Sequence, residues 1–387
     1  MTDKNKEFDY TDDDLELEDI DGFDPFDVLD DSYEDNKVYG NSKSSDSRGG
    51  KKNTKKKKRK NPVLVWAGRV GATLLATILM LVLFLYSVMA MLVYGPSKTA
   101  KIQFVLSVQE TSAIGFLANW FCSQDEIDQI KANNAIKDTD EITDAGLVNI
   151  DTSAQDPETP DIEIVDVKGA TYSGKLMIVK DPSRLFVGTV PEFTNGNGMV
   201  VADIAKRYDA IGGVNGGEFV DGDTTYTAMP IGLVMKDGEV LNDNGGTSHV
   251  TGITYDNKLV LGNMNAAKAK ELNIRDCVSI SNHIGPFLIV NGEAQDVVGI
   301  AGGTNPRTAI GQTADGKILL LAVDGRQPNS IGATFSDLQD IMAQYGAVNA
   351  STMDGGTSTQ MYYDGEIVNV PYSPTGPRSC PTAFLIK

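Results

Sequence analysis

An apolar run without a charged side chain, from Val70 to Tyr94, limits this chain more than any other feature. About 20 such residues cross the roughly 30 Å of bilayer hydrocarbon as a helix, which satisfies its own backbone hydrogen bonds. We therefore predict one transmembrane helix over residues 62–95. A cleaved signal peptide is the competing interpretation, but its apolar core is shorter and lies close to the first residue.

Basic residues are distributed unevenly around this run. A lysine-rich stretch over residues 51–60 precedes it, and only Lys98 and Lys101 follow closely. By the positive-inside rule, we expect the N-terminus in the cytoplasm and everything after the span outside, as in a single-pass protein of the cell membrane. The lysine-rich stretch adjoins the span, so we expect it to contact anionic lipid and not nucleic acid.

The composition changes along the chain and divides it into four parts. Residues 1–61 form an acidic and then basic tail, expected to be disordered because its apolar residues are too few to form a core. The span follows, and then a stalk over residues 96–161 that becomes polar and acidic. From residue 162 to residue 387, short apolar runs alternate with Gly, Asn-Gly and Asp-Gly, which is typical of strands joined by tight turns.

The expected fold of residues 162–387 is α+β, a mixed, strand-rich domain with a mixed sheet and a few covering helices. Hairpin turns are predicted at three dipeptides, Asp237-Gly238, Asn291-Gly292 and Asp315-Gly316. Helices are predicted over residues 200–208 and 335–345, the second opened by a capping pattern at Thr334 and closed by Gly346.

Three cysteines, Cys122, Cys277 and Cys380, are too few for a disulfide scaffold, and an odd number leaves at least one unpaired or pairing between chains. A bridge between Cys277 and Cys380 and a pair of buried free thiols both remain open.

His249 and His283 do not have a metal-ligand spacing, and the sequence contains no zinc, P-loop or dinucleotide motif. We therefore predict no required cofactor, while Asp and Asn clusters leave a divalent cation such as Ca²⁺ open. His283 precedes Gly285 in a loop and is a minor candidate for lining a cleft.

Two segments share one construction, an apolar strand followed by an Asx residue and two glycines. They are Val214-Asn215-Gly216-Gly217 and Met353-Asp354-Gly355-Gly356. Paired glycines permit positive φ and close approach of the backbone to a ligand, and successive N–H groups can hold an anion. Plain hairpin turns use the same residues, but the hydroxyls of Thr357, Ser358 and Thr359 beside Asp354 favour a site.

Arginines also stand at strand ends. Arg307 begins one apolar strand, and Asp324-Gly325-Arg326 follows the next. The chain carries a net charge of −19, of which about −16 falls on residues 70–387. An anionic substrate therefore has to be held by a few local arginines.

Four segments, taken in order, resemble the motifs of the phosphodiester glycosidase family over about residues 165–387. They are Asn215-Gly216-Gly217, Asn305-Pro306-Arg307-Thr308-Ala309, Asp324-Gly325-Arg326 and Asp354-Gly355-Gly356. The family includes an enzyme that removes N-acetylglucosamine from a mannose 6-phosphate diester, and many bacterial envelope proteins. The resemblance implies that residues 162–387 form the catalytic domain of a phosphodiester glycosidase.

The resemblance also implies roles for these residues. Loss of a sugar from a phosphodiester expels a phosphate monoester, a good leaving group with a second pKa of about 6. We expect Asp354 to be the nucleophile or general base, Asp324 the second carboxylate, and Arg307 a cation that supports the phosphate. The expected substrate contacts are Asn215, Gly216, Gly217, Glu218, Arg326, Gly355, Gly356, Thr357, Ser358 and His283.

The sequence thus predicts a membrane-anchored extracellular hydrolase that cleaves sugar-phosphate diester linkages in cell-envelope glycopolymers or their precursors. The alternative is a non-catalytic module that binds carbohydrate or phosphate polymer in exopolysaccharide or wall assembly. A third hypothesis is a scaffold whose cytoplasmic tail recruits a partner that the sequence does not identify.

Overall fold

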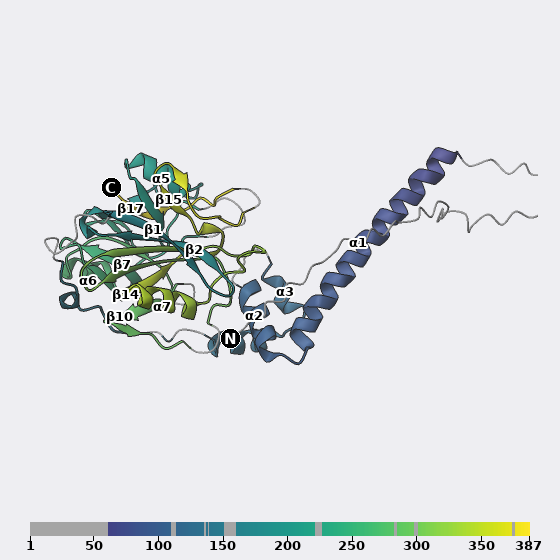
Figure 1. Cartoon of the computed structure of the whole chain (residues 1–387), viewed down its shortest axis with the longest axis horizontal. Coiled ribbons are helices and arrows are strands. Elements are labelled where there is room, and N and C mark those ends of the chain that lie inside the picture. The colour runs from purple at the N-terminus through teal and green to yellow at the C-terminus, as the bar shows by residue number, and fades with distance from the viewer. Residues whose placement is uncertain are drawn as a thin grey trace, which may run out of the picture. The chain divides into compact units, whose positions relative to one another are not determined.

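The computed structural model describes residues 61–109, 114–134, 137, 139–150, 160–220, 227–281, 285–297, 301–373 and 376–387 (Figure 1). The predicted tail, apart from Asn61, lies outside the described residues. The described residues fall into two units, with the division between Arg69 and Val70. The helices are α1 (Pro62–Tyr94), α2 (Lys98–Gln109), α3 (Phe116–Asn119), α4 (Gln124–Ala132), α5 (Val201–Arg207), α6 (Ala266–Glu271) and α7 (Phe335–Gln344).

Helix α1 has the length and bounds expected for a membrane span. Within the part of the chain that the structure describes, its segment Val65–Tyr94 is the one helix long and apolar enough to cross a membrane. Its large apolar side chains are mostly exposed, which suits contact with lipid. A signal sequence near an N-terminus has the same character.

The segment predicted to be a stalk folds into helices α2, α3 and α4, which we call the helical neck. Their apolar side chains pack with the end of α1 around Val105, Phe121 and Ile127. The neck also contacts the strand-rich domain, because Gln103 of α2 donates a 2.9 Å hydrogen bond to the hydroxyl of Thr304. Among the described residues, the neck is therefore packed at both ends.

The domain contains seventeen described strands in three sheets. They are β1 (Ile162–Lys168), β2 (Ser173–Val179), β3 (Leu185–Thr189), β4 (Gly212–Asn215), β5 (Val234–Lys236), β6 (Glu239–Asn242), β7 (Ser248–Thr254), β8 (Leu259–Met264), β9 (Ile274–Ser279), β10 (Phe287–Val290), β11 (Glu293–Ala294), β12 (Arg307–Thr313), β13 (Ile318–Val323), β14 (Ala347–Met353), β15 (Met361–Tyr363), β16 (Glu366–Ile367) and β17 (Thr382–Ile386).

The strand order is β1-β2-β13-β12-β14-β10-β11 in the first sheet, β16-β15-β4-β17-β3 in the second and β6-β5-β9-β7-β8 in the third. Each pairing between these described strands is antiparallel, for example β12 with β13 and with β14. The predicted α+β class is confirmed. The prediction of a mixed sheet is wrong, because tight turns join neighbouring strands and no described helix crosses over between parallel ones.

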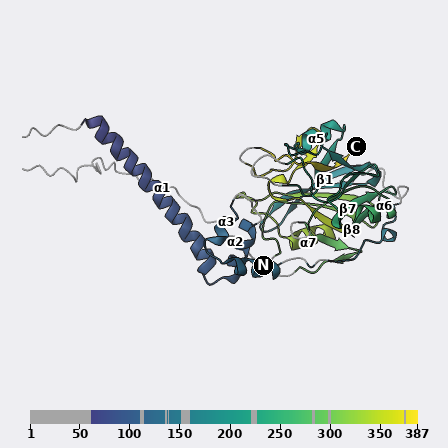
Figure 2. The ribbon, with the colours of Figure 1, turned by 180° about the vertical axis from the view of Figure 1, so that it is seen from behind.

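One buried core joins the three sheets. It contains side chains from the first sheet such as Ile310, from the second such as Phe384, and from the third such as Ile253. Helix α7 covers the other face of the first sheet, as predicted, beside β14 and β10 (Figures 1 and 2). Its start is fixed by a capping box between Thr334 and Asp337.

The predicted turn chemistry is also found. Asp237 and Asn291 have φ values of 52° and 55°, and each is followed by a glycine at 82°. Two consecutive residues at positive φ are the type I′ geometry that matches the twist of a hairpin. These turns close the pairs β5–β6 and β10–β11.

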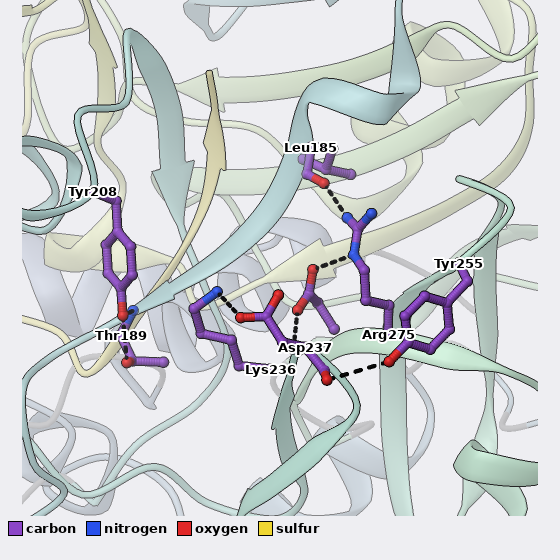
Figure 3. Close-up of polar contacts among 8 residues, drawn as sticks. Leu185, Thr189, Tyr208, Lys236, Asp237, Tyr255 and Arg275 are labelled. Atoms are coloured by element: carbon purple, nitrogen blue, oxygen red, sulfur yellow. Dashed lines mark hydrogen bonds and ion pairs between the residues drawn. The ribbon is translucent and has the colours of Figure 1, made fainter.

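A polar network joins the second and third sheets (Figure 3). Arg275 of β9 donates to the carbonyl oxygen of Leu185 in β3 and to the carboxylate of Asp276, the latter at 2.8 Å. The other oxygen of Asp276 accepts from the backbone N–H of Asp237 at 2.8 Å. The fully buried carboxylate of Asp276 is thus paired and hydrogen-bonded, as a buried charge requires.

Candidate active site

Three predicted catalytic residues lie at one edge of the first sheet. Strand β12 runs antiparallel to both β13 and β14, so its first residue lies beside their last residues. Arg307 pairs with Val323, and Thr308 pairs with Met353. Arg307, Asp324 and Asp354 are therefore brought together by strand register alone, although they are spread over nearly fifty residues of sequence.

Asn215, at the end of β4, connects the second sheet to this edge. Its side-chain oxygen accepts from the hydroxyl of Thr308 at 2.8 Å and from the backbone N–H of Gln360 at 3.2 Å. Its amide nitrogen donates to the carbonyl oxygen of Asp354 at 2.7 Å. Because Asn215 is fully buried, this geometry indicates a positioning role, and its expected substrate contact stays a prediction.

Gly216 and Gly217 do not form the anion-holding concavity that we expected. The N–H of Gly216 donates to the carbonyl oxygen of Thr382 at 2.9 Å, and that of Gly217 donates to its hydroxyl at 3.2 Å. Neither glycine has a positive φ. They are needed for close packing instead, because a Cβ at either position would overlap Thr382 or Ser279.

This packing makes a prediction about stability. In Gly217→Ala the new methyl group would overlap the carbonyl oxygen of Ser279, which cannot move without shifting β9. We expect the variant to lose about 1–3 kcal/mol of unfolding free energy, measured by urea denaturation. Gly196→Ala is the matched control, since only the hydroxyl of Thr194 lies near its Cβ, at 3.1 Å. Equal losses in both variants would contradict this explanation.

The turn after β14 holds Asp354. Its N–H donates to the carbonyl oxygen of Gly216 at 3.2 Å, and its own carbonyl oxygen accepts from the amide of Asn215. Both backbone polar groups of Asp354 are therefore fixed. Gly356 has a φ of 61°, the left-handed conformation that favours glycine, and Gly355 is extended. Asp354 and Thr357 are half-buried, as a residue that meets a ligand should be. Ser358, by contrast, is buried, so its side chain supports the turn.

Arg307 is almost entirely buried, with 4% of its surface exposed. Its guanidinium group lies 4.1 Å from the ring centre of Phe335 and donates to the carbonyl oxygens of Gly302 and Ala333. These contacts hold the loop before β12 against helix α7. The geometry therefore indicates a positioning role, and the expectation that Arg307 supports the departing phosphate stays a prediction.

Arg326 lies on the other side of the Asp354 turn. It has a φ of 58°, and its guanidinium group donates to the side-chain oxygen of Asn305 at 3.0 Å. Both of its terminal nitrogens lie 3.6 Å from the position of a Cβ on Gly356. A half-buried cation thus flanks the Asp354 turn, where we expected a substrate contact.

Arg378 is a cation near this turn that the sequence analysis missed. Its guanidinium group lies over the ring of Phe219 at 5.2 Å and donates to the hydroxyl of Thr357 at 3.4 Å. Thr357 follows Asp354 by three residues, so Arg378 reaches the same turn through this hydroxyl. Arg378 belongs to no motif, but the small number of arginines in an acidic domain could have pointed to it.

Asp324 is buried at the end of β13. One carboxylate oxygen accepts from the backbone N–H of Val370 at 2.9 Å and from the amide of Asn369 at 3.0 Å. Burial raises the pKa of this carboxyl above its ordinary value, although both hydrogen bonds and Lys175 counteract the shift. A carboxyl group with a raised pKa holds its proton to higher pH, which suits a proton donor.

The raised pKa of Asp324 predicts a pH dependence of stability. The folded state binds this proton more tightly than the unfolded state, so the stabilising contribution present in acid is lost as pH rises through the raised pKa. Asp324→Asn removes this dependence. We expect the variant to gain stability relative to the wild type as pH rises above the ordinary carboxyl pKa of about 4, measured in urea unfolding.

Asp166→Asn is the control for that experiment. A hydrogen bond from Lys175 lowers the pKa of the exposed Asp166 carboxyl, so its contribution has the opposite sign and is present above the ordinary pKa. A stability difference between Asp324→Asn and the wild type that does not change with pH would contradict the prediction.

The side chain of Glu218 reaches Ser281, just after the end of β9. The Glu218 carboxylate accepts from the N–H and the hydroxyl of Ser281, at 2.9 and 2.5 Å. It therefore fixes the chain just before His283, which lies outside the described residues. The predicted substrate contact of Glu218 stays a prediction.

The described residues contain neither a cluster of metal ligands nor a disulfide. In the described residues, no three His, Cys, Asp or Glu side chains gather as a metal site would require. Cys122, Cys277 and Cys380 are buried and free, which decides between the two alternatives for Cys277 and Cys380. Burial raises the pKa of the Cys277 and Cys380 thiols to about 12.

Carboxylates and arginines around one strand-edge turn are typical of hydrolase sites that accept an anionic glycoside. Residues 208–387 match the family model of the phosphodiester glycosidases, and this part of the chain belongs to that family. The predicted family is thus confirmed.

Three relatives illustrate the similarity. N-acetylglucosamine-1-phosphodiester alpha-N-acetylglucosaminidase of Mus musculus is 25% identical over 225 residues, which cover 53% of this chain and 42% of that protein. A protein from the SPbeta prophage of Bacillus subtilis is 40% identical over 65 residues, or 17% of this chain and 10% of that protein. The catalytic domain of the zebrafish N-acetylglucosamine-1-phosphodiester alpha-N-acetylglucosaminidase is 24% identical, with a TM-score of 0.48, covering 60% of this chain and 85% of that structure. This chain spans less than half the length of either curated relative.

Proposed function

We propose that this protein is a membrane-anchored hydrolase that cleaves glycosyl-1-phosphodiester linkages at the Asp354 turn. The observation that carries the proposal is the position of Asp354. Its backbone is fixed by Asn215 and Gly216, and Arg326 and Arg378 lie at the same turn. Family membership supports the reaction class.

The chemistry assigns a task to each group. The Asp354 carboxylate attacks the anomeric carbon, or takes a proton from a water that does so, and the bond from that carbon to the phosphate oxygen breaks. Where the carboxylate itself attacks, a water then adds to the anomeric carbon, its proton passes to the Asp324 carboxylate, and the glycosyl ester breaks to give free sugar and restore Asp354. The electron pair leaves on the phosphate oxygen, where Arg326 and Arg378 offset the developing charge. Asp324 holds a proton for the leaving oxygen, a small task because a phosphate monoester leaves readily.

We also propose where this reaction takes place. Helix α1 anchors the protein, the lysine-rich stretch keeps the N-terminus in the cytoplasm, and the glycosidase domain acts outside on envelope glycopolymers or their precursors. The domain needs no cofactor in this mechanism, because the two arginines supply the positive charge.

The experiment uses the full chain in lipid nanodiscs. Release of free sugar is measured from N-acetylglucosamine-1-phosphodiesters and from teichoic-acid-like glycerol phosphate polymers, with and without EDTA and added Ca²⁺. We expect release that Arg378→Ala reduces about 10²-fold and that EDTA does not change. Release that EDTA abolishes would overturn the cofactor-free mechanism, and absence of release from every substrate would overturn the hydrolase.

One observation favours the alternative of a non-catalytic binding module. Two motif residues expected to act on substrate, Asn215 and Arg307, are buried and bonded within the fold, so folding alone explains their presence. Tight binding of the polymers to the full chain, measured by calorimetry, without any sugar release would favour this module.

A further inference from the structure

The helical neck exposes three large apolar side chains at one place. Ile114, Phe116 and Trp120 are 40%, 53% and 59% exposed, and we call them the aromatic patch. The rings of Phe116 and Trp120 pack edge to face, with their centres 5.5 Å apart. Residues 114–122 contain no charged side chain. Single exposed apolar residues are ordinary, but a cluster in an uncharged segment indicates a contact surface.

Phe121, the next residue after the patch, fixes the position of α3 along helix α1. Its ring lies 5.1 Å from that of Tyr86 and 6.2 Å from that of Tyr94, measured between centres. The hydroxyl of Tyr94 donates to the carbonyl oxygen of Phe121 at 3.0 Å. Tyr86 and Tyr94 lie about 12 Å apart along a helix, so α3 lies beside the last turns of α1.

These last turns of α1 also expose apolar side chains, among them Met91 at 75% and Tyr94 at 69%. The patch and this end of α1 therefore flank the same buried Phe121. Two charged side chains of the neck pair with each other, since Lys101 and Glu126 form a 2.6 Å ion pair. A lipid surface would accommodate both the end of α1 and the uncharged aromatic patch beside it.

We propose that the aromatic patch inserts into the headgroup region of the bilayer that α1 crosses, on the side of the glycosidase domain. The inference rests on the membrane anchoring in the proposed function. Trp and Tyr favour this region because one end of each ring is apolar and the other is polar. Because Gln103 of the neck binds Thr304, an inserted α3 holds the domain against the membrane surface.

The chain offers a direct test, because its two tryptophans are Trp66 in α1 and Trp120 in the patch. Trp66→Phe leaves only Trp120, and Trp120→Phe leaves only Trp66. Each variant of the full chain is reconstituted into phosphatidylcholine vesicles. Its fluorescence quenching is measured with lipids brominated near the headgroup end of the acyl chain, and with aqueous iodide.

We expect the brominated lipid to reduce the fluorescence of Trp120 by about half. Iodide quenching of Trp120 in the vesicles is expected to be at least about threefold weaker than in the unfolded chain without detergent. In the Trp120→Phe variant, the brominated lipid is expected to quench Trp66, and this quenching reports the insertion of α1. Lipid quenching of Trp66 together with full iodide access of Trp120 would overturn this proposal alone. Absence of lipid quenching at Trp66 would overturn the anchoring, and the proposal with it.

Discussion

Replacing Asp354 with Asn is expected to lower kcat for sugar release by about 10³-fold or more while the unfolding free energy stays nearly unchanged. An amide can neither attack the anomeric carbon nor accept a proton from water. The backbone hydrogen bonds to Gly216 and Asn215 do not involve the substituted group, so the turn keeps its geometry. Initial rates over a substrate range separate this loss of kcat from a change in KM.

Asp364→Asn is the matched control for this variant. Asp364 is an exposed turn residue of the β15–β16 hairpin, with a φ of 47° that Asn also adopts. The same chemical change there is expected to leave kcat within about twofold of the wild type. If Asp354→Asn retained wild-type turnover, Asp354 would not be the catalytic carboxylate, and another group would have to carry the reaction.

Asn215→Ala is expected to produce the largest loss of stability, about 3–5 kcal/mol in urea unfolding. The substitution leaves the Thr308 hydroxyl, the Gln360 N–H and the Asp354 carbonyl oxygen without their buried partner. Each unsatisfied group costs about 1–3 kcal/mol. Because Asn215 also fixes the Asp354 backbone, kcat should fall even under conditions in which the variant is fully folded.

Thr308→Val serves as the comparison. It removes one of the three hydrogen bonds of Asn215 and preserves the shape of the side chain, so we expect a loss of about 1 kcal/mol. Equal losses in the two variants would show that Asn215 does not connect the sheets as the hydrogen bonds indicate.

The features that the sequence predicted well are those with a local physical signal. The long apolar helix α1 follows from the absence of charge between Val70 and Tyr94, while its crossing of a membrane stays a prediction. The turns at Asp237 and Asn291 follow from residues that accept positive φ, and α7 follows from its apolar face and the cap at Thr334. The predicted placement of the motifs at strand ends also agreed, since the motifs lie where their strands begin or end.

The features that the sequence did not predict depend on contacts between distant segments. Nothing local to Arg307 shows that its guanidinium group faces Phe335 and the loop at Gly302. Likewise, the bonds of Asn215 reach residues more than ninety positions away. Gly217 illustrates the same limit, because the residue that leaves no room for a Cβ at this position is Ser279, in another sheet.

The last described strand has a consequence for the order of folding. Strand β17 lies between β3 and β4 in the second sheet, and β3 pairs with no other described strand. During synthesis, β4 emerges about 170 residues, and β3 about 190 residues, before the strand that joins them. Contacts of such long sequence separation form slowly. The second sheet therefore stays incomplete until Thr382–Ile386 has been made, and Asn215 and the Asp354 turn reach their final geometry only when the sheet closes.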